Sequence, residues 1–368
     1  MTPAPASGAD VIPRREATRD LAAAKTHTIM NFATRLVATW YTPRVTPLAA
    51  LLWPWSLLYR SVVALRRALY GAGILRTHRL PVPVIVVGNL CVGGVGKTPL
   101  TCALAEQLAQ RGLQPGIVSR GYGGSSTVPR AVAAGDDPKV VGDEPLLLAE
   151  TGLPVWIGRD RADAGRALIM ANPSCDVIVA DDGLQHYALA RAMEIAVIDA
   201  SREFGNGLML PAGPLREPVA RLRDVDAVVR LVARGTPRPP AASGHETLMT
   251  HEPLPWRNLK HPGLAANPAQ WTNREVHAVA GIGNPQRFFA MIAALGIAAT
   301  AHAFPDHHDY SADDIAFPGA IAILMTQKDA VKCAAFADER CWYLPVEAVL
   351  DPALVALALE KIHGFKAA

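Results

Sequence analysis

The chain alternates short apolar runs with stretches of helical spacing from Pro81 onward. Each apolar run is hydrophobic at consecutive positions, which is typical of strands that are buried on both faces of a sheet. Helices between such strands favour a parallel sheet that is covered on both sides. The pattern predicts strands at 84–87, 116–119, 155–157, 176–180, 195–199 and 227–231, and helices at 98–111, 144–150, 161–171 and 215–223.

A second series of strands and helices begins near residue 276. It predicts strands at 276–280, 298–304, 321–325 and 342–344, and helices through 288–295, after Lys328 and through 353–362. A proline-rich, irregular segment separates the two series, and we interpret it as a crossing between two lobes that includes, at most, a short ribbon. The expected division is an extension without fixed structure at 1–35, a helical segment at 36–78, a core at 79–232, the crossing at 233–272 and a second lobe at 273–368.

The segment before the first strand is basic and rich in aromatic residues. Between residues 21 and 80 there are eight Lys or Arg residues and no Asp or Glu. Trp and Tyr favour the headgroup level of a bilayer, and Arg can pair with lipid phosphates. The uncharged run at 45–59 is shorter than the ~20 apolar residues needed to span a bilayer, and it contains Pro54. We therefore expect one or two helices lying in the interface of an anionic membrane; the alternative is an amphipathic helix packed on the domain.

Composition narrows the class of protein. Half of the 368 residues are hydrophobic, which is enough for a large core and for two lobes. The five cysteines form no Cys-x-x-Cys pair and no zinc-like spacing, so a reduced, cytoplasmic environment is the simplest interpretation. The polar, charged start of the chain predicts no secretory signal. Clustered Trp and Leu residues without an RNA or DNA motif argue against a nucleic-acid partner.

A buried strand that runs into a glycine-rich turn is the strongest functional signal. Glycines let backbone N–H groups approach phosphate oxygens, and the following helix directs its positive end toward them. A lysine can then reach the β and γ phosphates, and a hydroxyl can hold Mg²⁺. The predicted triphosphate-binding residues are Cys91, Val92, Gly93, Gly94, Val95, Gly96, Lys97 and Thr98. Cys91 stands where the usual motif has glycine, and the alternative interpretation is a simple glycine turn.

These elements together predict the fold class. It is α/β, with a P-loop NTPase-like, mainly parallel sheet that has helices on both faces. A second, smaller α/β lobe and N-terminal membrane-interface helices complete it.

Several polar side chains follow predicted strands. Asp181 and Asp182 end the strand at 176–180, where a phosphate-loop enzyme places an Asp near Mg²⁺. Neighbouring residues on a strand point to opposite faces, so we expect only one of them to be near the metal, and a turn or cap is the alternative. Arg120 and Tyr122 follow another strand, where open α/β sheets place ligands, and Arg216 lies in a constrained loop and could neutralise phosphate charge.

Two further segments have open interpretations. Asp143 and Glu144 open a helix, where Asp143 is as well explained by N-capping as by catalysis. His307 and His308, flanked by acidic residues at the end of a strand, could bind metal, move a proton or simply lie in a surface turn.

Taken together, the chain resembles the tetraacyldisaccharide 4′-kinases, the lipid A 4′-kinases of Gram-negative bacteria. The resemblance extends over residues 48–331, and its segments appear in family order. They are 86–99, 119–124, 142–145, 181–186, 204–218, 281–289, 304–310 and 325–332. One such segment would be weak, whereas eight in order are specific.

The resemblance implies transfer of the γ-phosphate of ATP to the 4′-hydroxyl of an acylated disaccharide 1-phosphate. The implied enzyme is a peripheral or monotopic protein at the cytoplasmic face of the bacterial inner membrane. It uses Mg²⁺ and has no obligatory protein partner. The resemblance also implies that the core at 79–232 is a P-loop kinase domain and that Asp143 is the general base, with His307 or His308 as its partner and a slight preference for His307. The implied site also includes Lys97 and Thr98 at the phosphates and Mg²⁺, Glu144, Asp181 and Asp182 around the metal, and Gln185, His186, Arg161 and Arg216 nearby.

The strongest rival is a membrane-associated ATPase switch. The segment 93–98 also resembles the loop of partitioning and cell-division-site ATPases. Those proteins have an extra lysine early in the loop, where this chain has Cys91 and Val92. A switch would hydrolyse ATP without an acceptor, whereas a kinase needs the lipid.

Overall fold

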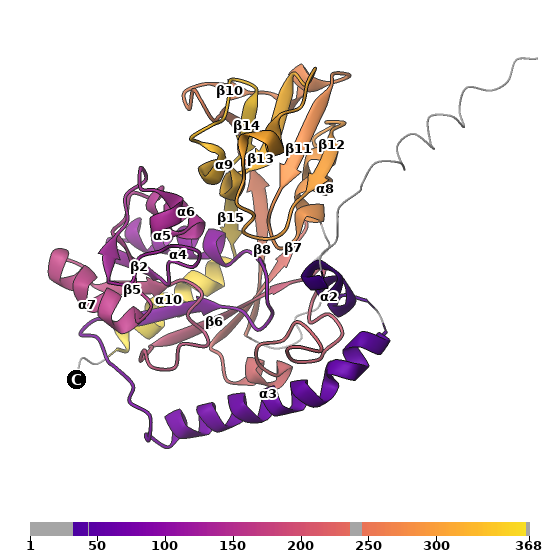
Figure 1. Cartoon of the computed structure of the whole chain (residues 1–368). Coiled ribbons are helices and arrows are strands. Elements are labelled where there is room, and N and C mark those ends of the chain that lie inside the picture. Colours follow the sequence, from indigo (N-terminus) through magenta and orange to yellow (C-terminus); the bar gives the residue numbers. More distant parts are fainter. Residues whose placement is uncertain (1–31, 43, 236–244, 366–368) are drawn as a thin grey trace, which may run out of the picture.

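The computed structural model describes residues 32–42, 44–235 and 245–365. Residues 1–31 of the predicted extension at 1–35 lie outside the described part of the chain. Residues 32–35 belong to helix α2 (Phe32–Trp40). The chain forms two lobes, a large one and a small one, that are joined by two extended strands (Figure 1).

The large lobe is built on a nine-stranded sheet in the order β15-β8-β7-β6-β1-β5-β2-β4-β3. All neighbouring strands are parallel except the pairs formed by β3 and β15 at the two edges. The strands are β1 (Val84–Gly88), β2 (Pro115–Ser119), β3 (Arg130–Ala131), β4 (Val155–Ile157), β5 (Val177–Ala180), β6 (Met193–Asp199), β7 (Ala227–Val232), β8 (Glu246–Pro253) and β15 (Val346–Leu350). The predicted mainly parallel sheet of the fold class is confirmed.

Helices cover both faces of this sheet. They are α4 (Lys97–Ala109), α5 (Pro138–Val141), α6 (Asp143–Ala149), α7 (Arg161–Ala171), α10 (Pro352–His363) and the 3₁₀ helix η1 (Val219–Arg223). On one face Ile85 of β1 packs with Leu104 of α4 and Leu354 of α10, and on the other Ile178 of β5 packs with Leu168 of α7. Consecutive apolar residues can therefore be buried on both sides of each strand.

The predicted helix at 215–223 is only partly present. The helical part is limited to η1, because Leu215 pairs with Cys91 and with Met209 in isolated bridges. Pro218 precedes η1 in an extended conformation and has no N–H to donate.

The small lobe has a six-stranded sheet in the order β10-β9-β14-β13-β11-β12. Its strands are β9 (Trp256–Asn258), β10 (Ala265–Ala266), β11 (Val276–Ala280), β12 (Thr300–Ala303), β13 (Ala322–Thr326) and β14 (Cys341–Leu344), and its helices are α8 (Pro285–Ala294), α9 (Gln327–Cys333), η2 (Pro268–Trp271) and η3 (Ala312–Ile315). Trp256, Trp271 and Phe288 form its aromatic core, with the two tryptophan rings meeting edge to face at 5.2 Å.

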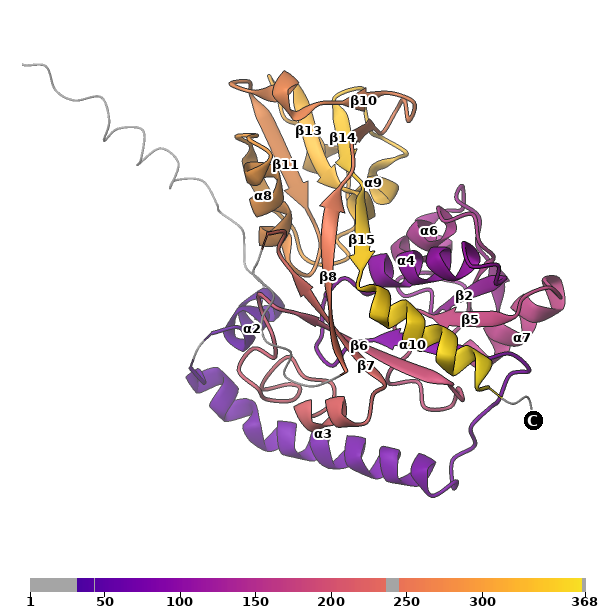
Figure 2. The same ribbon diagram turned by 180° about the vertical axis from the view of Figure 1, so that it is seen from behind.

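A two-stranded antiparallel ribbon joins the lobes. Strand β8 pairs with β15 in the large sheet, and the same two chain segments continue as β9 and β14, which pair in the small sheet. The Leu254 N–H donates to the Pro345 carbonyl at 2.9 Å between the two sheets. The described part of the segment at 233–272 includes strands β8, β9 and β10. Residues 346–363 of the predicted second lobe return to the large lobe, where α10 packs on one face of the sheet, the face turned toward the viewer in Figure 2.

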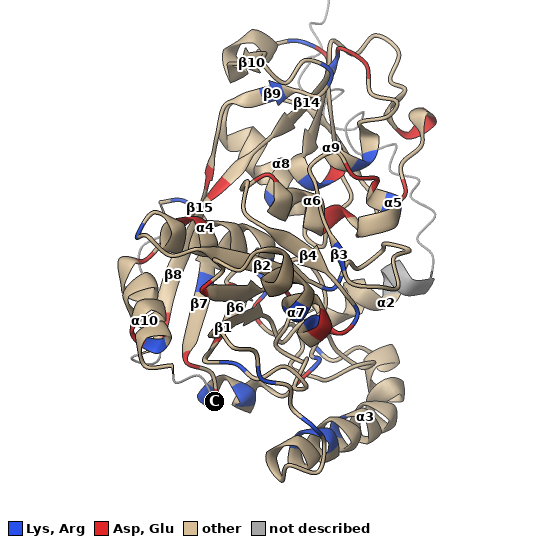
Figure 3. Cartoon of the chain, turned by 90° about the vertical axis from the view of Figure 1, so that its left-hand side faces the viewer, with Lys and Arg blue, Asp and Glu red and all other residues tan. Residues whose placement is uncertain are grey.

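Helix α3 (Pro47–Gly71) lies along one side of the large lobe. It is continuous through Pro54. Ser56 is buried and donates to the Met209 carbonyl at 2.8 Å, whereas Leu51, Trp55 and Leu58 are exposed. The helix carries Lys or Arg residues and no Asp or Glu (Figure 3), and it is long and apolar enough to cross a membrane by length and composition alone.

Because α10 packs on the large lobe, we expect the stability of that lobe to depend on it. Replacing the buried Leu354 with Ala should lower the free energy of unfolding by about 2–5 kcal/mol, because the cavity left behind is not refilled. Hydrogen exchange followed by mass spectrometry should show faster exchange in β1 and α4, with β11 and β13 unchanged. Glu360→Ala on the exposed face of α10 is the matched control. Faster exchange confined to the small lobe would contradict the assignment.

Candidate active site

The glycine-rich turn connects β1 to α4 and leaves its backbone open to a cavity. Gly93 and Gly96 have φ values of +104° and +92°, which residues with a Cβ rarely adopt. A Cβ on Gly96 would lie 2.9 Å from Leu231. Residues 94–98 line the cavity, whereas Cys91 is buried beneath the turn. Cys91 packs in an apolar cluster with Leu184 and Leu215, and burial raises the pKa of its thiol to about 11.

Lys97 and Thr98 open helix α4 and lie beside the two carboxylates that follow β5. Lys97 Nζ is 3.3 Å from Asn89 Oδ1 and 3.4 Å from Asp182 Oδ1. Thr98 Oγ1 donates to Asp181 Oδ2 at 3.2 Å. Because β1 and β5 are parallel neighbours, their carboxyl ends deliver these groups to one edge of the sheet.

Asp181 and Asp182 have opposite electrostatic environments. Asp181 is completely buried, and burial together with the charges of Glu144 and Asp182 raises its pKa to about 7. Burial also disfavours the charge on Asp182, but Lys97, Arg216 and Arg161 outweigh it and hold the Asp182 pKa below its usual range. Arg216 Nη1 is 3.2 Å from Asp182 Oδ1. Arg161 is buried and donates to the Asp182 carbonyl at 2.5 Å.

Asp143 and His307 meet across the boundary between the lobes. Asp143 opens α6 in the large lobe, and His307 lies in the loop after β12 in the small lobe. Asp143 Oδ2 is 3.1 Å from His307 Nδ1, while Asp143 Oδ1 accepts the Glu144 N–H at 2.9 Å. Burial disfavours the charge on Asp143, but the hydrogen bond from His307 and the charge of Lys328 hold the Asp143 pKa below its usual value.

The neighbouring histidine points into its own lobe. His308 Nε2 is 3.3 Å from Asp314 Oδ2, and its ring stacks on Phe304. His307 instead contacts the ring of Tyr122 with centroids 4.8 Å apart. Its φ of +59° is uncommon for a residue with a side chain. The geometry therefore distinguishes two histidines that the sequence left as alternatives.

Three other predicted site residues, Gln185, His186 and Arg120, differ in their burial and in their partners. Gln185 Nε2 donates to the Asn89 carbonyl and to Glu217, at 2.9 Å each. His186 lies 3.8 Å from Asp160, and burial and the charge of Arg161 lower the His186 pKa to about 4. Arg120 is exposed at the end of β2.

Two residues of the site were not identified in the sequence. Asn89 follows β1 directly and accepts from Lys97, and Lys328 in α9 lies within 3.8 Å of Asp143. The signal for Asn89 was its place between a buried strand and the glycine turn. The signal for Lys328 was its place just after a buried strand, which alone indicates no role.

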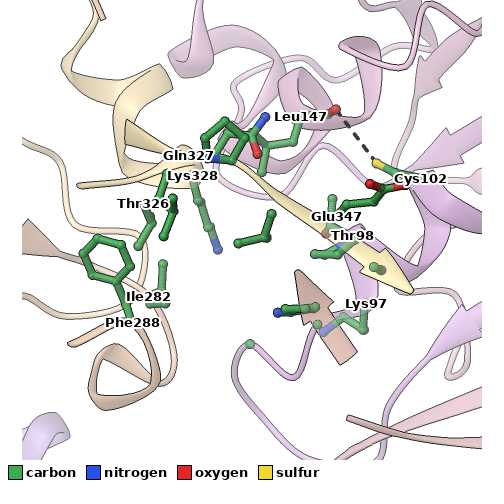
Figure 4. Close-up of a pocket in the computed structure, with 18 of the residues that line it drawn as sticks. Lys97, Thr98, Cys102, Leu147, Ile282, Phe288, Thr326, Gln327, Lys328 and Glu347 are labelled. Atoms are coloured by element: carbon green, nitrogen blue, oxygen red, sulfur yellow. Dashed lines mark hydrogen bonds between the residues drawn. The ribbon is translucent and has the colours of Figure 1, made fainter. Parts of the chain in front are cut away.

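A cavity of about 460 Å³ lies between the glycine turn and the small lobe (Figure 4). Lys97 and Thr98 face it from one side, and Ile282, Phe288 and Lys328 face it from the other. The backbones of Gly283 and Gly94 approach closely beside the cavity, because a Cβ on Gly283 would lie 2.3 Å from the Gly94 nitrogen. Asn284 Nδ2 also donates to the buried Asp199 at 3.1 Å, so the lobes are in direct contact beside the turn.

A family model described as tetraacyldisaccharide-1-P 4′-kinase (LpxK) matches residues 48–363. The chain belongs to this family. It is 49% identical over 310 residues to the tetraacyldisaccharide 4′-kinase of Methylobacillus flagellatus, covering 84% of this chain and 90% of that one. It is 50% identical over 320 residues to the enzyme of that name from an Azoarcus species, covering 86% and 93%.

A solved structure of a family member has the same fold. LpxK from Aquifex aeolicus, crystallised in complex with ATP, is 32% identical, with a TM-score of 0.72 over 86% of this chain and 99% of that one. This chain is therefore a kinase, a phosphotransferase of lipid A biosynthesis, with a P-loop kinase fold.

The buried Asp181 predicts a pH-dependent cost in stability. A carboxyl whose pKa is raised on folding destabilises the folded state progressively as the pH rises from about 4 to about 7. Asp181→Asn should therefore be more stable than the wild type at pH 8, because the substitution removes a carboxyl whose ionisation costs more in the folded than in the unfolded state. The difference should shrink toward pH 5. Urea unfolding without nucleotide or Mg²⁺ measures it, with the exposed Asp163→Asn as control. Equal stability at pH 8 would contradict the assignment.

Proposed function

We propose that the enzyme transfers the γ-phosphoryl group of ATP to the 4′-hydroxyl of an acylated disaccharide 1-phosphate. The observation that carries the proposal is the pairing of Asp143 with His307 across the lobes, next to the cavity lined by Lys97 and Thr98. A carboxylate kept ionised by its neighbours can accept a proton, and the glycine turn offers backbone N–H groups to the phosphates. The family membership supports a lipid disaccharide as acceptor.

The oxygen-bearing side chains beside the glycine turn suit Mg²⁺. Thr98 and Asp181 provide oxygen ligands 3.2 Å apart, with Glu144 and Asp182 beside them. Among the described residues, no group of three His, Cys, Asp or Glu side chains forms a complete metal cage. Mg²⁺ commonly takes only one or two carboxylates and completes its shell with phosphates and water. When bound, it would neutralise charge on the phosphates.

The protein groups divide the work of an in-line transfer. Asp143 takes the proton of the 4′-hydroxyl as the oxygen forms its bond to the γ-phosphorus and the bond from that phosphorus to the β–γ bridging oxygen breaks. Both Asp143 oxygens already accept one hydrogen bond, and each retains a lone pair. Lys97 and Arg216 provide positive charge for the moving phosphoryl group. Closure of the lobes excludes water, which limits hydrolysis of ATP.

Helix α3 suits a lipid substrate. Its buried side packs on the large lobe through Ala49 and Ser56, and its apolar outer side faces away from the protein. Amphipathic helices of this kind lie in the headgroup region, and their basic residues attract anionic lipids. We infer that α3 holds the enzyme at the cytoplasmic face of the inner membrane, as a peripheral or monotopic protein.

One assay tests the reaction directly. Incubation with γ-labelled ATP, Mg²⁺ and the acylated disaccharide 1-phosphate in detergent micelles should give a labelled bis-phosphorylated lipid. ATP turnover should depend on the lipid. Rapid ATP hydrolysis without acceptor, and no labelled lipid, would instead support the switch ATPase.

The proposed roles of Asp143 and His307 predict that substitutions at these residues lower kcat, whereas a substitution at the neighbouring His308 does not. Asp143→Ala should lower kcat by about 10²- to 10⁴-fold, with little change in ATP affinity, because it removes a proton acceptor. His307→Ala should lower kcat at least about tenfold. His308→Ala is the matched control and should stay near wild type, since His308 contacts Asp314. Steady-state kinetics and calorimetric ATP titration measure both quantities. Near-normal turnover of Asp143→Ala would remove the assigned base.

The membrane role of α3 predicts a separable defect. Leu51 and Trp55 are 73% and 63% exposed, and burying two such side chains contributes several kcal/mol, at about 1.5–3 kcal/mol each. Replacing both with Asp should reduce binding to anionic vesicles by at least about a hundredfold in flotation assays, without altering the circular dichroism spectrum. Leu264→Asp, at an exposed position of the small lobe, is the control. Equal flotation of all three proteins would contradict the role of α3.

A further inference from the structure

Lys328 places a single ammonium group among the acidic residues of both lobes. Its Nζ is 3.0 Å from Glu144 Oε1 in the large lobe and 3.3 Å from Asp306 Oδ1 in the small lobe. The same atom is 3.4 Å from His307 Nε2 and 3.8 Å from Asp143 Oδ2. The side chain is 13% exposed. Lys328 therefore contacts both members of the catalytic pair.

Helix stability does not explain a lysine at this position. Lys328 lies in the first turn of α9, where the helix dipole disfavours a positive charge. Burial disfavours the charge further, and the contacts with Glu144, Asp306 and Asp143 offset that cost. The position of Lys328 is therefore explained by its carboxylate and imidazole neighbours.

The contact with His307 determines where the imidazole carries its proton. An ammonium group has three donors and no acceptor. The ring nitrogen that faces Lys328 must therefore accept, which leaves the proton on the other nitrogen. That other nitrogen, Nδ1, faces Asp143 Oδ2 at 3.1 Å, which is within donating distance of the carboxylate.

We propose that Lys328 is a positioning residue for phosphoryl transfer: its ammonium group fixes the direction of the hydrogen bonds at His307, so that the ring accepts at Nε2 and donates from Nδ1 to Asp143. Asp143 is thereby held with its free lone pairs available to the 4′-hydroxyl. The ring keeps its proton while Asp143 takes the substrate proton, and Lys328 remains protonated. The inference rests on the proposed function for its catalytic consequence.

No other described group near His307 replaces this contact. Asp306 Oδ1 is 3.9 Å from His307 Nε2, and Tyr122 contacts the ring by its face. On the same helix, Lys332 pairs with Asp329 at 2.9 Å. Without Lys328, the nearest charged neighbours of Nε2 would be acidic, and acidic neighbours favour a protonated nitrogen.

The test compares Lys328→Met with Lys328→Arg and Lys139→Met. Lys139 is an exposed lysine whose Nζ lies 3.9 Å from Asp309 in the same loop as His307, so its removal is a matched loss of charge. ¹⁵N spectra of the imidazoles at pH 8, assigned with His307→Gln, report which ring nitrogen is protonated. Lipid phosphorylation gives kcat and the KM for ATP.

The proposal expects a specific set of results. Wild type, Lys328→Arg and Lys139→Met should show Nδ1 protonated and Nε2 unprotonated, whereas Nε2 becomes protonated in Lys328→Met. The kcat of Lys328→Met should fall at least about tenfold with the KM for ATP little changed, and Lys328→Arg should recover part of it.

Three results would overturn the proposal. They are Nε2 protonated in the wild type, an unchanged ring in folded Lys328→Met, or a raised KM for ATP at unchanged kcat, which would make Lys328 a phosphate ligand. The wild-type spectrum decides the matter even if Lys328→Met does not fold. A wild type that phosphorylates no lipid would remove the proposed function, while the spectra would still test the hydrogen-bond direction.

Discussion

The contact between Asp143 and His307 is the interaction on which the site depends, because its two members come from different lobes. The large lobe contains the glycine turn and Asp143, and the small lobe contributes the imidazole that Asp143 contacts. The lobes meet on two sides of the cavity, through Asn284 with Asp199 beside the glycine turn and through Lys328 with Glu144 beside the pair. The β8–β9 and β14–β15 ribbon supports this arrangement, since it is the part of both sheets that passes from one lobe to the other.

Charge at the site is arranged so that each carboxylate has a different environment. Asp182 is held ionised by Lys97 and Arg216, and Asp143 by His307 and Lys328, whereas the buried Asp181 has a raised pKa. A cation bound beside Asp181 would offset the cost of ionising this buried carboxyl, and Asp143, the proposed proton acceptor, lies elsewhere, at the lobe boundary. In the proposed mechanism, this separation gives the acidic residues distinct tasks within one small volume.

Local patterns in the sequence predicted the fold well where neighbouring residues determine it. The apolar run of β1, the glycine turn and the parallel rhythm up to β7 were all predicted. The return of β15 and α10 to the large sheet was not, because the antiparallel pairing of β15 with β8 joins segments almost a hundred residues apart, and no local pattern encodes it. For the same reason the sequence could offer Asp143 and a histidine as candidates, but only the tertiary arrangement distinguishes His307 from His308 and reveals Lys328.

A double-mutant cycle on the catalytic pair tests the central claim most directly. The kcat for lipid phosphorylation would be measured for Asp143→Ala, His307→Ala and the double variant. If the two residues act as one unit across the lobes, the double variant should be about as slow as Asp143→Ala alone, because His307 has no task without its partner. Fully additive losses, with the double variant slower by the product of the two single effects, would contradict the account.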